Sequence, residues 1–431
     1  MHVLGLDIGS SSVKAAVLRG TRVVGHIARA GFATRYDGPR AEVEPEHVVR
    51  AVARAIKNVG AGARQVDAIA LSVMSPAWVA MDKRGKPLTP IVTHQDRRST
   101  DVARELEKRI GKARHLRLCG NRPFPGGISS TTWAWFKRHH PGVMRRADLV
   151  GHLNTFLHAR LTGARVIDPS NASFTGLYRI DQTGWSDELM EAVGATEHQV
   201  PQLVGGDGVA GLVTHAAARA FGLTHGTPVL TGVIDGTSAM LLAGARPGQL
   251  LDVCGSTDVL ALCVARPRPH ERLITRALGV GRAWLSVSTQ AAAGSALTWV
   301  RDQLFCDGDK ASFDKIVRGL AANPMPSAVR FDNHLAGDRT SLEQRAGAIT
   351  GLTLSSTRRQ ILSSVIESLA AASSERLELL REVNETVRRT VVVSGGAAAG
   401  LADILHRDWP GKWSFRVEEE ASLRGLGTLL T

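Results

Sequence analysis

The stretch "LGLDIGSSSVKAAVL", residues 4–18, decides the fold prediction for this chain. Its apolar residues predict two β-strands, 3–8 and 13–18, joined by a turn of glycine and serine. Such turns are favoured for backbone reasons alone, and in that interpretation Asp7 only caps the turn. In the other interpretation, the N–H groups and hydroxyls of the turn form a nest for phosphate oxygens. Asp7 would then hold a hydrated Mg²⁺, a cation that prefers oxygen ligands, with the positive charge of Lys14 nearby.

Length and composition predict a soluble cytoplasmic protein. A chain of 431 residues, 43% of them hydrophobic, is long enough for about two or three domains with substantial cores. The four cysteines have no close spacing, which argues against a disulfide framework and a zinc site. The N-terminus lacks the pattern of a signal peptide, and no apolar run reaches the roughly 18 residues of a membrane helix. We therefore expect no membrane partner.

The basic charge of the chain raises nucleic acid as a partner. The formal net charge is +13, but the basic residues are spread along the sequence without a long basic run. Only 5% of the residues are aromatic, which is poor for base stacking. A dispersed arginine-rich surface is the preferred interpretation, and it is compatible with attraction of small anionic substrates. We expect no nucleic-acid partner.

Strand and helix patterns alternate along the chain, which predicts an α/β fold. The apolar spacing and the Gly and Pro signals at the ends of the segments define the expected elements. Further strands are expected at 66–73, 227–235 and 390–396, and helices at 47–59, 99–111, 131–142, 151–163, 214–223 and 357–383.

A second stretch repeats the pattern of the first. "QLLDVCGSTDVLALC", residues 249–263, again places an aspartate and a small polar turn between apolar runs. Two such hairpins about 245 residues apart suggest two related domains, for which we predict residues 1–242 and 243–431. A nucleotide held in a cleft between two such hairpins resembles the arrangement of the superfamily of actin, the heat-shock ATPase chaperones and the sugar kinases, with its actin-like, ribonuclease H-like domains.

Asp235 is the candidate for a catalytic base. In "PVLTGVIDGTSAMLLAGA", residues 228–245, it ends an apolar strand and is followed by Gly236. The strand would fix the carboxylate while glycine lets a ligand approach closely. In the alternative interpretation Asp235 caps a helix that begins near Thr237.

At this point the whole chain resembles the FGGY carbohydrate kinases. Besides the first hairpin and "GVIDG", four segments are similar to the family's motifs in the right order. They are "DKRGKPLTPIVTHQDRRS" (82–99), the central stretch "LTGARVIDPSNASFTGLYRIDQTGWSDELMEAVG" (161–194), "VVVSGGAAAG" (391–400), like the adenosine loop, and "EEEASLRGLGTLL" (418–430), like the closing helix.

The resemblance implies ATP-dependent phosphorylation of a small sugar or polyol, with ATP and Mg²⁺ as cofactors. Asp235 would accept the proton of the acceptor hydroxyl, and Asp7 would help to hold Mg²⁺. The residues implied in nucleotide binding are Gly9, Ser10, Ser11 and Lys14 in the first domain and Gly255, Ser256, Thr257, Gly395, Gly396 and Ala397 in the second. The residues implied in acceptor binding, besides Asp235, are Trp78, Gln95, Asp96 and Arg97. For Asp96 and Arg97, a surface ion pair at a helix start is the competing interpretation.

The sequence departs from the family pattern at several positions. The usual Gly-Thr-Ser is Gly255-Ser256-Thr257 followed by Asp258, which is nearer to a branch resembling ribulose and xylulose kinases. A carboxylate beside phosphates is unfavourable unless it faces away or helps to hold the metal. Gly400 stands where the adenosine loop often carries asparagine, and His94 replaces the tryptophan before the Asp-x-Arg pattern.

The acceptor therefore stays open, with a ketose such as a pentulose as the first expectation. A kinase for glycerol or another short polyol, a non-catalytic sugar or nucleotide sensor on the same fold, and an actin-like or chaperone-like ATPase are the alternatives. The first partner we expect is a small sugar or polyol, and a homodimer stays open.

Overall fold

The computed structural model describes residues 1–181, 183–384, 386–395 and 398–430. Two compact units are present. The first consists of residues 1–246, 263–285 and 420–431, and the second of residues 247–262 and 286–419. The predicted domain division, 1–242 and 243–431, stays a prediction about homologous halves. Within the described part of the chain, no helix is both long and apolar enough to cross a membrane.

A seven-stranded mixed sheet forms the centre of the first unit. The predicted hairpin is present, and its first strand also pairs in parallel with a strand that begins sixty residues after the first strand ends. In sheet order the strands are β12 (Val209–Leu212), β13 (Pro228–Leu230), β6 (Ala68–Val73), β1 (His2–Ile8), β2 (Ser12–Arg19) and β3 (Arg22–Gly31), and β14 (Val233–Ile234) also pairs with β6.

A six-stranded sheet repeats this connectivity. Its order is β17 (Ile274–Ala277), β18 (Trp284–Gln290), β16 (Asp258–Val264), β15 (Leu250–Cys254), β21 (Thr390–Ser394) and β22 (Ser414–Val417). The hairpin β15–β16 is antiparallel, and β15 pairs in parallel with β21, as β1 pairs with β2 and β6. The strand orders β6-β1-β2-β3 and β21-β15-β16-β18 correspond, so the two turns occupy the same place in their sheets, which confirms the predicted α/β fold with two related halves.

The remaining strands form smaller sheets. The largest has five strands, β4 (Arg35–Asp37), β5 (Arg40–Val43), β8 (Ile91–Thr93), β7 (Ala77–Met81) and β9 (Leu149–His152). Two further strand pairs are β10 (Val166–Ile167) with β11 (Gln202–Leu203) and β19 (Arg330–Asp332) with β20 (Ala348–Thr350).

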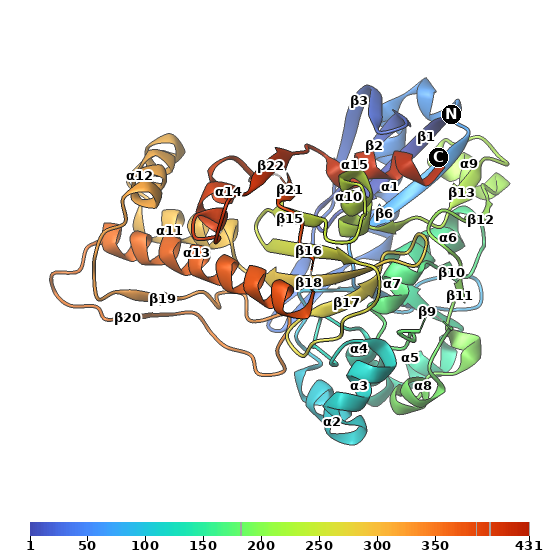
Figure 1. Ribbon diagram of the computed structural model, residues 1–431. Coiled ribbons are helices and arrows are strands. Elements are labelled where there is room, and N and C mark those ends of the chain that lie inside the picture. The colour runs from blue at the N-terminus through green and yellow to red at the C-terminus, as the bar shows by residue number, and fades with distance from the viewer. Residues whose placement is uncertain (182, 385, 396–397, 431) are drawn as a thin grey trace. The chain divides into compact units, whose positions relative to one another are not determined.

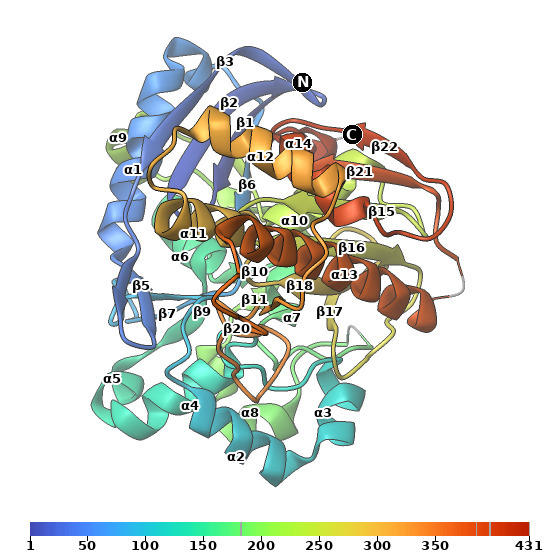
Figure 2. The same ribbon diagram turned by 90° about the vertical axis from the view of Figure 1, so that its left-hand side faces the viewer.

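The helices cover the sheets. In the first unit α1 packs on β2 and β3 (Figure 2), and in the second α13 packs against α12 and β19 (Figure 1). The helices are α1 (Pro45–Val59), α2 (Thr100–Ile110), α3 (Lys112–Cys119), α4 (Ser130–His139), α5 (Pro141–Arg146), α6 (Leu153–Leu161), α7 (Pro169–Ser173), α8 (Asp187–Val193), α9 (His215–Phe221), α10 (Asp235–Ala243), α11 (Gly294–Leu304), α12 (Lys310–Ala322), α13 (Arg358–Val383), α14 (Ala398–His406) and α15 (Ala421–Gly425), with 3₁₀ turns at Ala61–Arg64, Glu197–Gln199 and Leu426–Leu430.

Three predicted elements are divided in the structure. The expected helix 151–163 begins as β9, because residues 149–152 are buried and pair with β7. The expected helix 131–142 ends at His139, and Pro141 starts α5. The expected strand 227–235 is interrupted at Gly232, whose φ is +71°.

The core of the first unit also buries histidines. The His158 side chain on α6 is fully buried, and its Nε2 lies 2.8 Å from the carbonyl oxygen of Thr231. Burial lowers the pKa of His158 to about 4, although the hydrogen bond to the Thr231 carbonyl opposes this. His158 is therefore neutral in the folded protein at neutral pH.

We expect acid to destabilise the protein partly through His158. Its folded pKa lies below the unfolded value of about 6.5, so the stability due to neutral His158 is present above that pH and is lost as the pH falls toward about 4. At about 1.4 kcal/mol per pKa unit, the loss is about 2 kcal/mol at pH 5.

His158→Gln keeps a donor toward Thr231 and does not titrate. Its Tm should fall less than that of the wild type between pH 6.5 and pH 5. The exposed His47→Gln is the control, and equal slopes for wild type and His158→Gln would contradict the prediction.

Candidate functional site

Three polar side chains gather at one edge of the first sheet because of strand register. Asp7 on β1 is paired with Ser72 on β6, and Ser72 is paired with Val233 on β14. All three strands run in parallel, so their carboxyl ends meet at the same edge. Asp235 directly follows β14 and therefore lies at this edge with Asp7 and Ser72.

Asp7 is a buried carboxylate with few compensating contacts. It is 5% exposed, accepts a hydrogen bond from Ser72 Oγ at 2.5 Å, and lies 4.0 Å from Lys14 Nζ. Burial raises the pKa of Asp7 to about 6. Ser72 and Lys14 oppose the rise, whereas the charges of Asp235 and Glu420 add to it. A buried carboxylate whose pKa is raised further by a second carboxylate nearby forms a site that a cation would stabilise.

Lys14 has a partner that the sequence analysis did not identify. Its ammonium group lies 2.6 Å from a carboxylate oxygen of Glu420, which also pairs with Arg29. Burial raises the pKa of Glu420 and these ion pairs lower it, and the net pKa lies below the usual value. Lys14 was predicted to contact phosphate. In the structure its charge is shared between Asp7 and Glu420, so a phosphate would have to compete with Glu420.

Asp235 begins α10 instead of preceding a helix that starts near Thr237. The helix starts two residues earlier than in the capping interpretation, with Ile234 at the N-cap position. The Asp235 carboxylate accepts a hydrogen bond from its neighbour's N–H, at Gly236, over 2.6 Å. A Cβ atom at position 236 would lie 2.8 Å from Nη2 of Arg276, so a buried guanidinium borders the same backbone. The carboxylate of Asp235 is partly exposed.

The first turn has carbonyl groups that are already hydrogen-bonded and two N–H groups, at Ser10 and Ser11, that meet no acceptor in the described part of the chain. Gly9 N–H donates to the Ser12 carbonyl, and the carbonyl groups of Ser10 and Ser11 accept from Thr34 Oγ1 and Phe32 N–H. Within the described residues, no acceptor meets the N–H groups of Ser10 and Ser11, and both side chains are exposed. Such a turn can accept the oxygens of an anion.

The second turn repeats this arrangement. Gly255 N–H donates to the Thr257 carbonyl at 2.9 Å, and the start of α11 bonds the carbonyl groups of Gly255 and Ser256. The described part of the chain offers no acceptor to the N–H groups of Ser256 and Thr257. Asp258 faces away from this turn, because its carboxylate is 1% exposed and pairs with Arg376. Burial raises the pKa of Asp258 well above its usual value and Arg376 opposes the rise, so this carboxyl group is paired in the core and does not lie beside the phosphates.

The segment predicted to bind adenosine lies next to the second hairpin. Gly395 has a φ of +117°, and a Cβ atom there would lie 2.0 Å from the carbonyl oxygen of Cys254. Only glycine fits this approach. Gly400 also has a positive φ, +88°. The other two predicted residues, Gly396 and Ala397, lie outside the described residues.

The predicted acceptor-binding residues divide into buried and accessible ones. Trp78 is 2% exposed and stacks on Phe136, with ring centroids 4.8 Å apart. Gln95 accepts a hydrogen bond from the exposed Tyr36 hydroxyl at 2.7 Å. Arg97 donates to the carbonyl groups of His94 and Asp96.

Asp96 is held in a buried ion pair and not in the surface pair considered above. Its carboxylate is 1% exposed, accepts from Ala41 N–H at 2.8 Å, and pairs with Arg98 at 2.6 Å. Arg98 also pairs with Glu42, and its guanidinium lies over the Trp135 ring. The ion-pair partner of Asp96 is therefore Arg98, two positions later in the chain, and not Arg97.

Comparison with known proteins agrees with this architecture. Residues 2–242 match the N-terminal domain and residues 250–401 the C-terminal domain of the FGGY family of carbohydrate kinases. The xylulose kinase of Streptomyces coelicolor is 26% identical over 407 residues, covering 93% of this chain and 81% of that protein.

Solved structures show the same fold. A xylulose kinase from Rhodospirillum rubrum has a TM-score of 0.85 at 24% identity, covering 99% of this chain and 88% of that one. A glycerol kinase from Plasmodium falciparum, solved with ADP, has a TM-score of 0.82 at 16% identity, also covering 99% and 88%.

The fold and the matches together define a two-domain α/β carbohydrate kinase. The chain belongs to the FGGY family, and it is an ATP-using transferase that moves a phosphoryl group to a hydroxyl of a sugar or polyol. The family resemblance inferred from the motifs is thereby confirmed.

We expect Asp96 to act in stability. Asp96→Ala would leave the buried Arg98 guanidinium without its main partner, and breaking such a pair costs about 3–5 kcal/mol. Thermal unfolding should show a large loss of Tm, whereas the exposed Asp101→Ala should change Tm little. An Asp96→Ala protein with normal Tm and a raised KM for the acceptor would instead assign Asp96 to substrate binding.

Proposed function

We propose that this protein phosphorylates a hydroxyl of a small ketose or polyol, with a pentulose as the first candidate and Asp235 as the general base. The observation that carries the proposal is the position of Asp235. It follows β14 at the edge where Asp7 lies near the end of β1, and the charge of Asp235 adds to the burial that raises the pKa of Asp7. A base at a strand end is held rigidly, as proton transfer in the transition state requires.

The residues at this edge fit a magnesium ion. Asp7 offers a carboxylate whose burial is incompletely compensated, and hard oxygen donors are what Mg²⁺ prefers. Asp7 is the residue that would hold the ion, with Asp235 alongside. When bound, the ion would neutralise charge on the transferred phosphoryl group. Positive charge would also relieve the repulsion between the two carboxylates.

The two turns are proposed to bind the phosphates of ATP. The N–H groups at residues 10–11 and 256–257, which meet no acceptor among the described residues, supply donors, and the exposed hydroxyl groups of Ser10, Ser11 and Ser256 add to them. Gly9 and Gly255 shape the turns, and Lys14 supplies charge when it leaves Glu420. We propose that Gly395, Gly396 and Ala397 bind the nucleoside, because small residues let it approach the backbone.

The acceptor is proposed to contact the region of Trp78, Gln95 and Arg97 in the first unit. The pentulose preference rests on the Gly255-Ser256-Thr257 variant and on similarity to xylulose kinases. Glycerol or another short polyol is the alternative acceptor.

An ADP-release assay with Mg²⁺ and ATP across pentuloses, hexuloses, tetritols and glycerol tests the proposal. We expect release above background only with an acceptor, and highest with a pentulose. ADP release should also stop when EDTA removes Mg²⁺. If ATP binds but no acceptor raises the rate, the protein is a sensor and not a kinase for these compounds.

Asp235→Asn tests the role of the base. Asparagine keeps the size of the side chain and its hydrogen bond from Gly236 but cannot accept the proton, so kcat should fall on the order of 10² to 10⁴-fold. Tm and the affinity for Mg-ATP should stay near those of the wild type. The exposed carboxylate variant Asp207→Asn should keep full activity. Near-normal phosphorylation by Asp235→Asn would end the catalytic assignment.

A further inference from the structure

A buried polar cluster lies beneath the second turn, outside the residues assigned above. Asp252 and Cys254 alternate along β15 and so share one face, and Asp258 on β16 is the direct cross-strand partner of Cys254. Asp252, Cys254 and Asp258 are almost completely buried. Acidic side chains on the covered face of a sheet require partners from the elements packed upon it.

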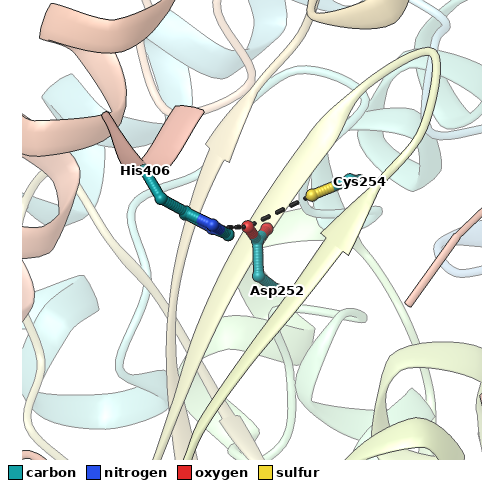
Figure 3. Close-up of side chains that lie close together, drawn as sticks. All are labelled: Asp252, Cys254 and His406. Carbon is teal, nitrogen blue, oxygen red and sulfur yellow. Dashed lines mark hydrogen bonds and ion pairs between the residues drawn. The ribbon is translucent and has the colours of Figure 1, made fainter. Parts of the chain in front are cut away.

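Two helices supply those partners. His406, the last residue of α14, places Nε2 2.5 Å from Oδ2 of Asp252. Cys254 Sγ lies 3.2 Å from the same oxygen (Figure 3). Arg376 of α13 pairs with Asp258. One carboxylate oxygen of Asp252 therefore accepts from both an imidazole and a thiol.

The geometry indicates hydrogen bonds and not metal coordination. The ligand atoms of Asp252, Cys254 and His406 lie within 4.8 Å of one another, a set that could be considered for Zn²⁺. Two ligands at about 2.1 Å from one tetrahedral Zn²⁺ lie roughly 3.4 Å apart. The 2.5 Å between Asp252 and His406 is too short for shared coordination and suits a charge-assisted hydrogen bond.

The protonation states agree with this interpretation. Burial lowers the pKa of His406 to about 4, so the ring is neutral and Nε2 carries the proton that it donates to Asp252. Burial, with the nearby charges of Asp252 and Asp258, raises the pKa of the Cys254 thiol, so Sγ also donates. The charges that face His406 are those of Asp252, Asp258 and Asp403 and the guanidinium of Arg376.

The cluster connects the two segments that are proposed to hold the nucleotide. Asp252 and Cys254 lie on β15, directly before the turn at 255–257. His406 is the last residue of α14, and Gly395 precedes this helix in the chain. At the backbone level Gly395 lies against the Cys254 carbonyl. The Asp252–His406 hydrogen bond therefore joins β15 and its turn to α14, in addition to the contact at Gly395.

We propose that His406, Asp252 and Cys254 are positioning residues that hold the turn at 255–257 and the adjoining Gly395 in the geometry required for nucleotide binding. The inference rests on the proposed function and adds residues that touch neither substrate. The Arg376–Asp258 pair fixes the other strand of the same hairpin. Nucleotide affinity should depend on the donor at position 406, whereas acceptor affinity should not.

Calorimetric titration with Mg²⁺ and the non-hydrolysable analogue AMP-PNP tests the proposal. His406→Leu removes the donor, and its Kd should rise about tenfold or more, while the KM for the acceptor stays within twofold. His406→Gln restores an N–H donor and should recover a Kd within about threefold of the wild type. A second comparison sets the Kd of Cys254→Ala against that of the conservative variant Cys254→Ser. We expect a smaller change in Kd here than at position 406.

The controls separate positioning from stability and from metal binding. Ser363→Ala removes a buried hydrogen bond to Met325 N–H in the same unit, and it should lower Tm without changing Kd. A His406→Leu protein with lowered Tm and unchanged Kd would overturn the proposal, as would equal Kd values for the Leu and Gln variants. One zinc per chain in the purified protein would also overturn it. If the wild type itself binds no Mg-nucleotide, the proposed function fails, and this inference fails with it.

Discussion

The parallel pairing of β6 with both β1 and β14 is the constraint on which the candidate site depends. It sets Asp7, Ser72 and Asp235 at one sheet edge by register alone, without any contribution from loops. The consequence is electrostatic, because burial raises the pKa of Asp7 and the nearby charge of Asp235 adds to the rise. A folded protein tolerates such an arrangement when function uses the charge, and we propose that this protein uses it for a cation and for a proton.

The two units share the same arrangement of a hairpin and a parallel strand but have different residues beneath the turn. In each, a hairpin ends in a turn with unpaired N–H groups, and a parallel strand flanks the first strand of the hairpin. Beneath the first turn, Asp7 is met by Ser72 and by Lys14, which Glu420 shares. Beneath the second, Asp252 and Asp258 are met by His406, Cys254 and Arg376. The first carboxylate keeps capacity for a ligand, whereas in the second set the Oδ2 atoms of Asp252 and Asp258 are paired with side chains of α13, α14 and β15, which suits a supporting role.

The partners of the buried charges explain why some sequence interpretations of the site changed. Asp96 was weighed as a sugar ligand or as half of a surface ion pair with its neighbour. The chain turns so that Arg98 reaches it, and the strand residue Ala41 donates to the same carboxylate. No spacing rule predicts this, because the choice between Arg97 and Arg98 depends on which side chain the loop directs into the core. The pairing of Lys14 with Glu420 joins residues 406 positions apart, so local sequence contains no signal for it.

The sequence by itself determined the local elements and the family. The hairpin at residues 3–18 follows from alternating apolar runs around a Gly-Ser turn, and the helix expected at 357–383 forms at Arg358–Val383 with Thr357 as its cap. Ordered motifs identified an FGGY kinase because each motif is local. Only the tertiary structure decided that α10 begins at Asp235, that Asp258 turns away from the second turn, and that His406 bonds to Asp252 across 154 positions. The physical reason is that burial and ion pairing depend on what packs against a side chain, and in this protein those partners come from distant strands and helices.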